Sequence, residues 1–133
     1  MANALFDAGR EGFLAGDIDW DADDIKAWLH DDTDHTISLS ADRDLADITA
    51  GAIEETSGNL GSKTTTDGAA DAGDVTFSSA SGDACDQVGV YYDSGVAGTS
   101  LLICRFDTAS GLPVTLNGGD VVAQWHANGL FTL

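Results

Sequence analysis

Alternating aspartates are the residues of this sequence whose types and spacing first suggest chemistry. Seven aspartates fall in the sixteen positions from 17 to 32, and the first four alternate with other residues: Asp17, Asp19, Asp21 and Asp23. Alternating carboxylates also open the calcium-binding loop of an EF-hand. That loop needs glycine at its sixth position and glutamate at its twelfth, where this sequence has Ala22 and Trp28. An EF-hand is therefore excluded. Two alternatives stay open for the four aspartates, a looser cation site and a solvated acidic loop, and the pattern favours the loop.

A second group of candidate metal ligands follows directly and combines imidazole with carboxylate groups: His30, Asp31, Asp32, Asp34 and His35. Such a group can bind a divalent ion, but it also arises by chance in an aspartate-rich chain, so an exposed loop is the simpler interpretation. No Gly-x-Ser-x-Gly elbow or Walker A sequence is present. We predict no enzyme activity, no catalytic residue, no cofactor and no metal ion. One alternative is kept, because any two of the 23 acidic residues could form a hydrolytic pair.

The charge of the chain is strongly negative, with 23 acidic residues against 5 basic ones and a formal net charge of −18. Proteins that bind nucleic acid or anionic membranes need clustered lysine and arginine, so we expect neither partner. The simplest explanation for this charge is solubility, which high net charge favours. Two more specific explanations are adaptation to high salt and binding to a basic or cation-bridged partner. No apolar run approaches the roughly 20 residues of a membrane span, and the start lacks a signal-peptide pattern. We therefore expect a chain that is made and used without export.

The elements that must position these residues begin with a helix expected from residue 3 to residue 15. Asn3 can cap this helix and Gly16 is a natural stop. Its larger apolar residues are near helical spacing and predict one stripe: Leu5, Phe6, Phe13 and Leu14. A strand is expected from residue 24 to residue 30, with Trp28 on its more polar side. An exposed Trp28 would mark an interface, whereas a covered one would mean that both strand faces are buried; both alternatives stay open.

The rest of the chain indicates β-structure around one long polar segment. Residues 57–73 predict a turn-rich loop, within which residues 63–66 are a candidate edge strand. Before this loop, residues 35–39 are a candidate strand and residues 45–53 are ambiguous between a helical turn and a loop. Short strands are expected after it: residues 74–78, 87–92, 100–106, 113–116, 120–126 and 129–133. The Asn-Gly-Gly sequence after residue 116 predicts the clearest hairpin, between residues 112–116 and 120–125.

These elements predict a mainly β protein, an antiparallel β-sandwich or jelly-roll-like barrel with a short N-terminal helix. We expect a single domain over residues 1–133, made of a helical segment, 1–16, and a β-rich body, 24–133, which includes the polar loop 57–73. Cys85 and Cys104 are expected to be buried free thiols, because a chain that is not exported keeps its cysteines reduced.

Three stretches resemble small structural proteins encoded among the head and tail genes of tailed bacteriophages. They are "MANALFDAGREGFLAGDIDWDADDIKAWLHDD" (1–32), "TSGNLGSKTTTDGAADAGDVTFSS" (56–79) and "DTASGLPVTLNGGDVVAQWHANGLFTL" (107–133). The resemblance is one of overall pattern and order, is weakest over residues 83–106, and contains no catalytic or ligand motif. No functional residue is therefore carried over from the family.

The resemblance implies a virion component, most similar to a capsid cement (decoration) protein. Such proteins are commonly β-rich trimers on the outer shell, so it implies the major capsid protein and further copies of this chain as partners. It also implies a location on the outer surface of the capsid after synthesis in the host cytoplasm. The alternatives are a neck or tail component and a carbohydrate- or receptor-binding virion module, which would expose aromatic residues: Trp28, Tyr91, Tyr92 and Trp125.

The residues predicted to contact a partner are apolar and lie in the N-terminal part of the chain: Phe6, Phe13, Leu14, Trp20 and Trp28. Chain termini are free to reach out toward a partner. The alternative for this segment is that it packs onto its own sheet.

Overall fold

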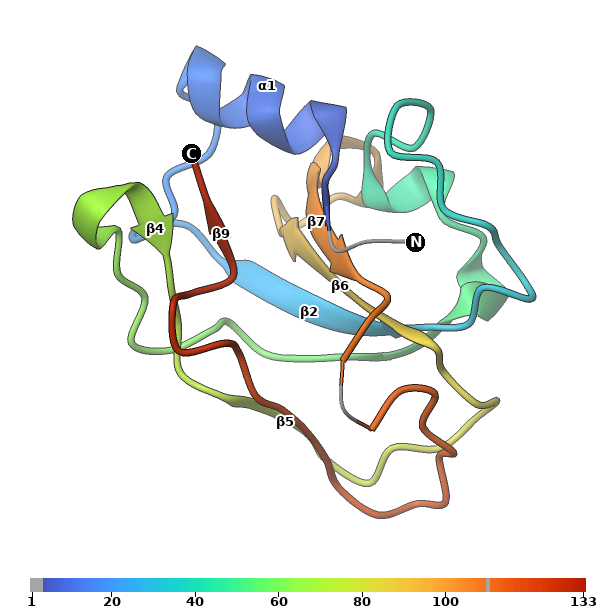
Figure 1. The fold of residues 1–133 in the computed structure, drawn as a ribbon. Helices are drawn as coiled ribbons and strands as arrows, with labels where there is room; N and C mark the ends of the chain where they lie inside the picture. The colour runs from blue at the N-terminus through green and yellow to red at the C-terminus, as the bar shows by residue number, and fades with distance from the viewer. Residues whose placement is uncertain (1–3, 110) are drawn as a thin grey trace.

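A five-stranded antiparallel sheet forms the centre of the molecule, with its strands in the order β1-β7-β6-β2-β3 (Figure 1). The computed structural model describes residues 4–109 and 111–133. The strands of this sheet are β1 (Ala4–Leu5), β2 (Ile25–His30), β3 (Ile53–Thr56), β6 (Gln87–Tyr92) and β7 (Leu102–Phe106). Two antiparallel pairs complete the β-structure: β4 (Ala69–Ala70) with β9 (Phe131–Thr132), and β5 (Val75–Phe77) with β8 (Val121–Ala123). The mainly β, antiparallel prediction is confirmed, and the described strands do not close into a barrel.

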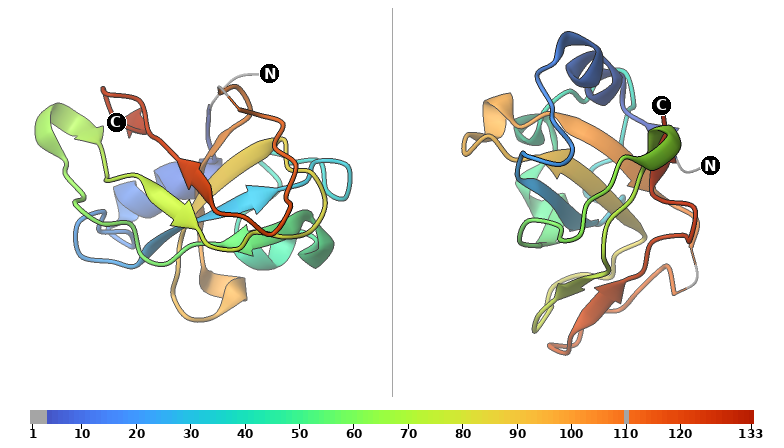
Figure 2. Two further views of the ribbon diagram at one scale, coloured as in Figure 1. Left: turned by 90° about the horizontal axis from the view of Figure 1, so that it is seen from below. Right: turned by 90° about the vertical axis from the view of Figure 1, so that its left-hand side faces the viewer.

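β2 lies between β6 and β3, and both of its faces are covered. Ile25 and Leu29 point into one apolar cluster, which continues into β4, β5 and β9. Trp28 points the other way into a second cluster, where it is fully buried with Phe6 and Ile48. The predicted period-two alternation is therefore confirmed, and the open question about Trp28 is answered in favour of the covered alternative. Figures 1 and 2 show α1 at one end of the molecule and the pair β5–β8 at the opposite end, with the main sheet between them.

The N-terminal helix is shorter than the sequence predicts. α1 spans Asp7–Ala15, and Phe6, in an extended conformation, occupies its N-cap without a side-chain hydrogen bond. Asn3, the predicted cap, lies outside the described residues. Gly16 ends the helix in the left-handed conformation, with φ 79°, which confirms the predicted stop, since glycine adopts positive φ without a steric penalty.

The face that α1 turns toward the sheet consists of its smallest residues, Ala8, Gly9 and Gly12, all of which are buried. A Cβ atom on Gly9 would lie 2.7 Å from the Cα of Ile103 in β7, so the helix and the strand meet backbone to backbone. The predicted apolar stripe is therefore wrong: Leu14 is 89% exposed. Close approach of the two backbones, rather than burial of large side chains, fixes the orientation of the helix.

The predicted hairpin between residues 112–116 and 120–125 is also wrong. β8 pairs with β5 instead, and Val114 forms an isolated bridge with Cys85. The Asn-Gly-Gly turn does not close a hairpin because its glycines exchange two backbone hydrogen bonds with Ala80, at 2.7 and 2.9 Å. The strand that follows the turn is thereby placed beside the residues just before Ala80.

The remaining segments contain short turns. Residues 35–39 form no strand, and the predicted edge strand at 63–66 is reduced to a single bridge between Thr64 and Asp71. In residues 4–109 and 111–133, four 3-10 helices connect the strands: η1 (Leu45–Asp47), η2 (Ala50–Ala52), η3 (Thr66–Gly68) and η4 (Ala97–Thr99). Within the described ranges, no helix has both the length and the apolar character needed to cross a membrane.

Candidate functional site

The alternating aspartates form a hydrogen-bonded turn. The Asp19 carboxylate accepts the N–H groups of Asp21 and Ala22 at 3.1 and 3.2 Å, and the Asp23 carboxylate accepts the N–H of Asp19 at 2.8 Å. The side chains of Asp17, Asp19 and Asp21 are exposed. Over the part of the chain that the structure describes, carboxylates converge at a different place. This geometry supports the interpretation of residues 17–23 as a solvated acidic loop.

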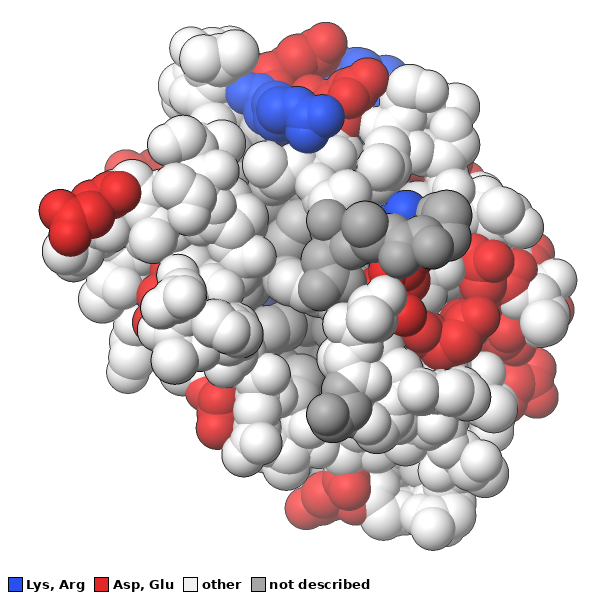
Figure 3. Space-filling model, in the orientation of Figure 1, with Lys and Arg blue, Asp and Glu red and all other residues white. Residues whose placement is uncertain are grey.

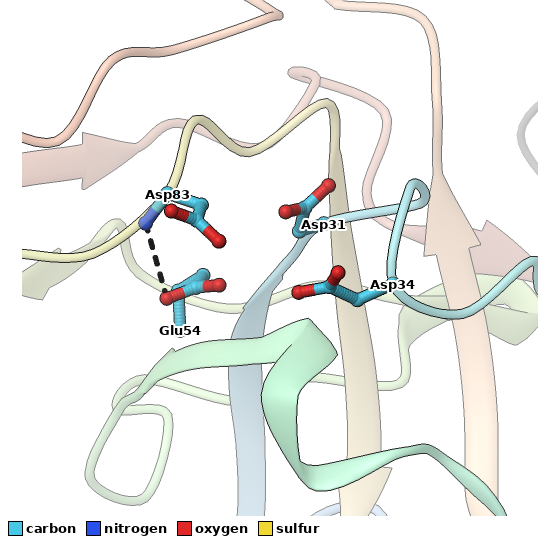
Figure 4. Close-up of side chains that lie close together, drawn as sticks. All are labelled: Asp31, Asp34, Glu54 and Asp83. Atoms are coloured by element: carbon cyan, nitrogen blue, oxygen red, sulfur yellow. Dashed lines mark hydrogen bonds between the residues drawn. The ribbon is translucent and has the colours of Figure 1, made fainter.

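Four carboxylates from separate segments converge instead near the end of β2: Asp31, Asp34, Glu54 and Asp83 (Figure 4). One oxygen of each lies within 4.8 Å of the others. Asp31 directly follows β2, and the N–H of Asp34 donates to its carbonyl at 3.2 Å. Glu54 lies on β3, and its carboxylate accepts the N–H of Asp83 at 3.2 Å. Calcium and magnesium ions prefer carboxylate oxygens, so these four residues, which we call the acidic cluster, could hold a divalent cation.

Sequence reasoning found only half of the acidic cluster. Asp31 and Asp34 belong to the second group of candidate ligands, but Asp32 does not join them, because its carboxylate accepts a hydrogen bond from Gln87 at 2.9 Å. Glu54 and Asp83 come from distant segments that are brought close by the pairing of β3 with β2 and by the turn before β6. No spacing in the sequence could have indicated that meeting.

The surroundings of Glu54 in the acidic cluster favour the neutral form of its carboxyl group by raising its pKa. Burial, as the main cause, raises the pKa of Glu54 above its ordinary value, and the negative charges of Asp83, Asp31 and Asp34 raise it further. The hydrogen bond from the Asp83 N–H acts in the opposite direction. The cluster is therefore a place where negative charge is costly, as is expected for carboxylates that share one site.

Replacement of Glu54 by glutamine is expected to stabilise the protein in a buffer free of divalent ions. The change removes one negative charge from the acidic cluster and keeps an oxygen that can accept the Asp83 N–H. We expect a gain below about 1 kcal/mol, because the cluster is open to solvent. Urea unfolding in the presence of EDTA measures this gain in the free energy of unfolding. Glu55→Gln is the control, since the Glu55 carboxylate accepts the N–H of Ser81 outside the cluster; equal effects of the two changes would contradict repulsion as the cause.

The two cysteines are buried free thiols, as the sequence predicts. Burial, reinforced by the nearby carboxylates of Glu54 and Asp31, raises the pKa of Cys85 to about 12. Burial alone raises the pKa of Cys104. Because the thiolate is the reactive and metal-binding form, neither cysteine is suited to act as a nucleophile or a metal ligand near neutral pH.

His30, one of the two histidines of the second candidate group, has both ring nitrogens occupied. Trp28 Nε1 donates to His30 Nδ1 at 3.1 Å, and His30 Nε2 contacts the His35 carbonyl at 2.7 Å. Because Nδ1 accepts, the proton sits on Nε2, which donates to the carbonyl, and the ring is neutral. Burial lowers the pKa of His30 below its ordinary value. This side chain is therefore a structural hydrogen-bonding group, and no nitrogen is left to bind a metal ion.

The stability of the protein is expected to fall as the pH decreases through about 6.5, the ordinary pKa of histidine. Below that pH the unfolded chain binds a proton at His30 that the folded chain does not. The contribution of neutral, buried His30 to the free energy of unfolding is complete above about pH 6.5. As the pH falls further, this contribution is lost at up to about 1.4 kcal/mol per pH unit, until His30 in the folded protein also binds a proton. NMR of the imidazole nitrogens measures the protonation state of His30 in the folded protein directly. A protonated His30 Nδ1 in the folded protein at pH 6.5 or above would contradict this expectation.

The predicted partner contacts are mostly buried within the chain itself. Phe6, Trp20 and Trp28 are 0%, 4% and 0% exposed, so these three side chains pack within the chain. Phe6 and Trp28 fill the second apolar cluster and Trp20 belongs to the first. Phe13 is partly buried, and Leu14 alone of the five is open to solvent. For most of this segment, packing onto its own sheet is therefore the alternative that applies.

No protein-family model matches the sequence, and no curated protein shows significant sequence similarity to it. The described residues bring together two candidate features, the acidic cluster and an apolar surface beside Phe13. Neither feature places a nucleophile next to a base.

Proposed function

We propose that this chain is a non-enzymatic structural protein of a tailed-bacteriophage particle, namely a capsid cement protein that binds the outer shell as an oligomer. The observation that carries the proposal is the resemblance of three stretches in the order found in such proteins: residues 1–32, 56–79 and 107–133. These stretches correspond to the α1–β2 segment, the turn-rich polar segment and the C-terminal strands.

A rigid body supports this role. Both faces of β2 are covered, and the side chains on this strand are buried with the exception of Lys26. Lys26 is itself held at 2.6 Å from Asp93. A protein that reinforces a shell works by bridging neighbouring subunits, so that leaving requires several interfaces to break together. A body that does not deform under load suits such a bridge.

The surface charge fits a position outside the particle. Figure 3 shows acidic side chains gathered on the right-hand side and scattered along the lower edge, with few basic ones among them. A chain with a net charge of −18 does not adhere to free DNA or to anionic envelopes. The same charge attracts a basic or cation-bridged shell surface. The acidic surface therefore supports a capsid partner and disfavours nucleic acid.

The alternative of a carbohydrate- or receptor-binding module receives less support. Of the four aromatic residues that it needs, Trp28 and Tyr91 are buried at 0% and 4% exposure. Tyr92 and Trp125 are half-buried, and the indole of Trp125 donates to the Gly73 carbonyl at 2.9 Å. The aromatic residues therefore serve mainly the core. A neck or tail component remains the second candidate, because the resemblance extends to proteins of both the head and the tail gene groups.

Electron cryo-microscopy of the particle tests the location. We expect density for this chain on the icosahedral shell, in groups of three where capsomers meet. Density restricted to the neck or tail would replace the cement proposal with the second candidate.

Heating shells with and without purified protein tests the mechanism. Decorated shells are expected to open at a higher temperature than bare shells. An unchanged opening temperature would argue against reinforcement even where the protein is bound.

A further inference from the structure

An apolar groove lies where the end of α1, the loop after it and the C-terminal strand meet. Its volume is about 380 Å³, within the range of pockets that hold small ligands or anchoring side chains. Figure 1 shows α1, β4 and β9 close together in this region. Aromatic and aliphatic side chains line the groove: Phe13, Ile18, Trp20, Phe131 and Leu133.

The aromatic lining is fixed in place. The Phe131 ring contacts Phe13 and Trp20, with centroid distances of 5.7 and 5.4 Å. The Trp20 indole N–H is already satisfied, because it donates to the Asp71 carbonyl at 3.1 Å. The groove therefore presents a preformed apolar surface, and the indole N–H of Trp20 is not available to bind an occupant.

An exposed apolar side chain belongs to this surface. Leu133 lines the groove and is 63% exposed. It is one of the four large hydrophobic residues that are exposed among the described residues. Exposed apolar surface of this kind marks a place where proteins bind other molecules.

The rim of the groove is acidic. Asp19 is part of its lining, Asp17 and Asp21 are exposed in the same loop, and Asp67 is exposed in the η3 turn between two lining residues. No basic residue belongs to the described lining. The nearest basic residue in sequence to the η3 turn, Lys63, is engaged with the Asp23 carbonyl and with Asn59. An occupant with negative charge is therefore repelled, and one with positive charge is attracted.

We propose that this groove docks a segment of a partner protein in which an apolar side chain is flanked by lysine or arginine. The apolar side chain fills the groove and the flanking cations pair with the aspartates of the rim. A second copy of this chain fits less well, because it brings another net charge of −18 to an acidic rim. The inference deepens the proposed function, on which it rests for the identity of the partner as a capsid subunit; the chemistry of the segment follows from the groove alone.

Peptide titration monitored by NMR tests the groove. The probe is the peptide acetyl-Lys-Lys-Phe-Leu-Lys-Lys-amide, added to the ¹⁵N-labelled full chain at low salt. One comparison peptide replaces the lysines with glutamate and a second replaces Phe-Leu with Ser-Ser. We expect saturable shifts at the amides of Phe13, Ala69 and Phe131 with the probe, and at least tenfold weaker binding of both comparison peptides. Equal binding of the Ser-Ser peptide, or shifts centred elsewhere, would overturn the proposal.

Two variants and a control locate the binding. Leu133→Ser is expected to weaken binding of the probe peptide about fivefold to tenfold, because it removes exposed apolar surface without changing the core. Ala69→Arg places bulk and positive charge in the groove and is expected to abolish binding. Val122→Ser removes a comparably exposed apolar side chain, 53% exposed, on β8, and is expected to leave binding unchanged. A loss with Val122→Ser equal to that with Leu133→Ser would overturn the assignment.

The same variants separate this inference from the proposed function. If the parent protein binds shells and Ala69→Arg binds them equally well, the groove is not the docking surface, although the cement proposal stands. If the parent never binds shells but binds the probe in the groove, the cement proposal fails and the chemistry of the groove stands. Groove shifts that grow with protein concentration in the absence of peptide would identify a second copy as the occupant and overturn the inference.

Discussion

Replacement of Gly89 by alanine is expected to destabilise the protein by about 3 kcal/mol, the upper end of the usual cost of overpacking a core. Gly89 lies on β6 directly opposite Trp28 on β2. A Cβ atom at this position would lie 2.1 Å from Cη2 of the indole and 2.3 Å from two further ring carbons. These distances are far below van der Waals contact, so the indole, the strand or both must move.

The indole has no space into which it can move. Trp28 is fully buried, its ring packs edge-on against Tyr91 with a centroid distance of 5.9 Å, and its N–H is bound to His30. Displacement of the ring would break that hydrogen bond and leave polar atoms unpaired in the core, which adds to the steric cost. One methyl group at Gly89 therefore acts on packing and hydrogen bonding together.

Thermal and urea unfolding measure the effect, with Gly98→Ala as the matched control. Gly98 has open space around its Cβ position, so alanine there is expected to change the stability by less than about 1 kcal/mol. A double-mutant cycle with Trp28→Phe isolates the contact: in that background Gly89→Ala is expected to cost much less, because the atoms it would strike are gone. An equal cost in both backgrounds would show that the indole is not the obstacle.

Replacement of Gly9 by alanine is the second change with a large expected effect, a loss of about 1 to 3 kcal/mol. Helix propensity predicts the opposite sign, because alanine favours a helix over glycine by about 1 kcal/mol. The new Cβ would lie 2.7 Å from the Cα of Ile103 and 2.8 Å from the carbonyl oxygens of Ile103 and Leu102. Backbone atoms cannot rotate away as a side chain can, so α1 must lift from β7 and the packing penalty outweighs the gain in propensity.

Hydrogen exchange at the amides of α1 and β7, together with the unfolding free energy, checks this expectation. Leu14→Ala on the same helix is the control. Its side chain is 89% exposed, so the change is expected to be nearly neutral. If Gly9→Ala stabilises the protein, the helix does not rest on the strand as closely as described.

The sequence predicts the layout of β2 well, because Ile25, Ala27 and Leu29 alternate with Lys26, Trp28 and His30. It predicts less well what the neighbouring strand contributes. Val88 and Val90 on β6 point into the first apolar cluster, and the alternating Tyr91 on the opposite face is buried in the second cluster with Trp28. A glycine inside a strand often marks a close approach, and here Gly89 makes room for the indole.

The predictions that fail involve contacts between distant segments. The Asn-Gly-Gly sequence indicates a turn correctly, but the strand that pairs beyond it is chosen by hydrogen bonds to Ala80. The spacing of Phe6 and Phe13 indicates a helix correctly, but Ala8 and two glycines form the buried face. Glu54 likewise meets Asp31 only after β3 has paired with β2. Local pattern identifies elements in each case, and long-range packing decides their partners.

The two glycine contacts also set limits on how this protein can change during evolution. Half of the twenty aspartates are exposed, so mutation can exchange and redistribute many of these charges without loss of the fold. Gly9 and Gly89 have no substitute, because each occupies a space in which one carbon atom collides with a backbone or a ring. Distant descendants that share the fold should therefore keep these two glycines, together with a tryptophan opposite the second, long after the acidic surface has diverged beyond detection.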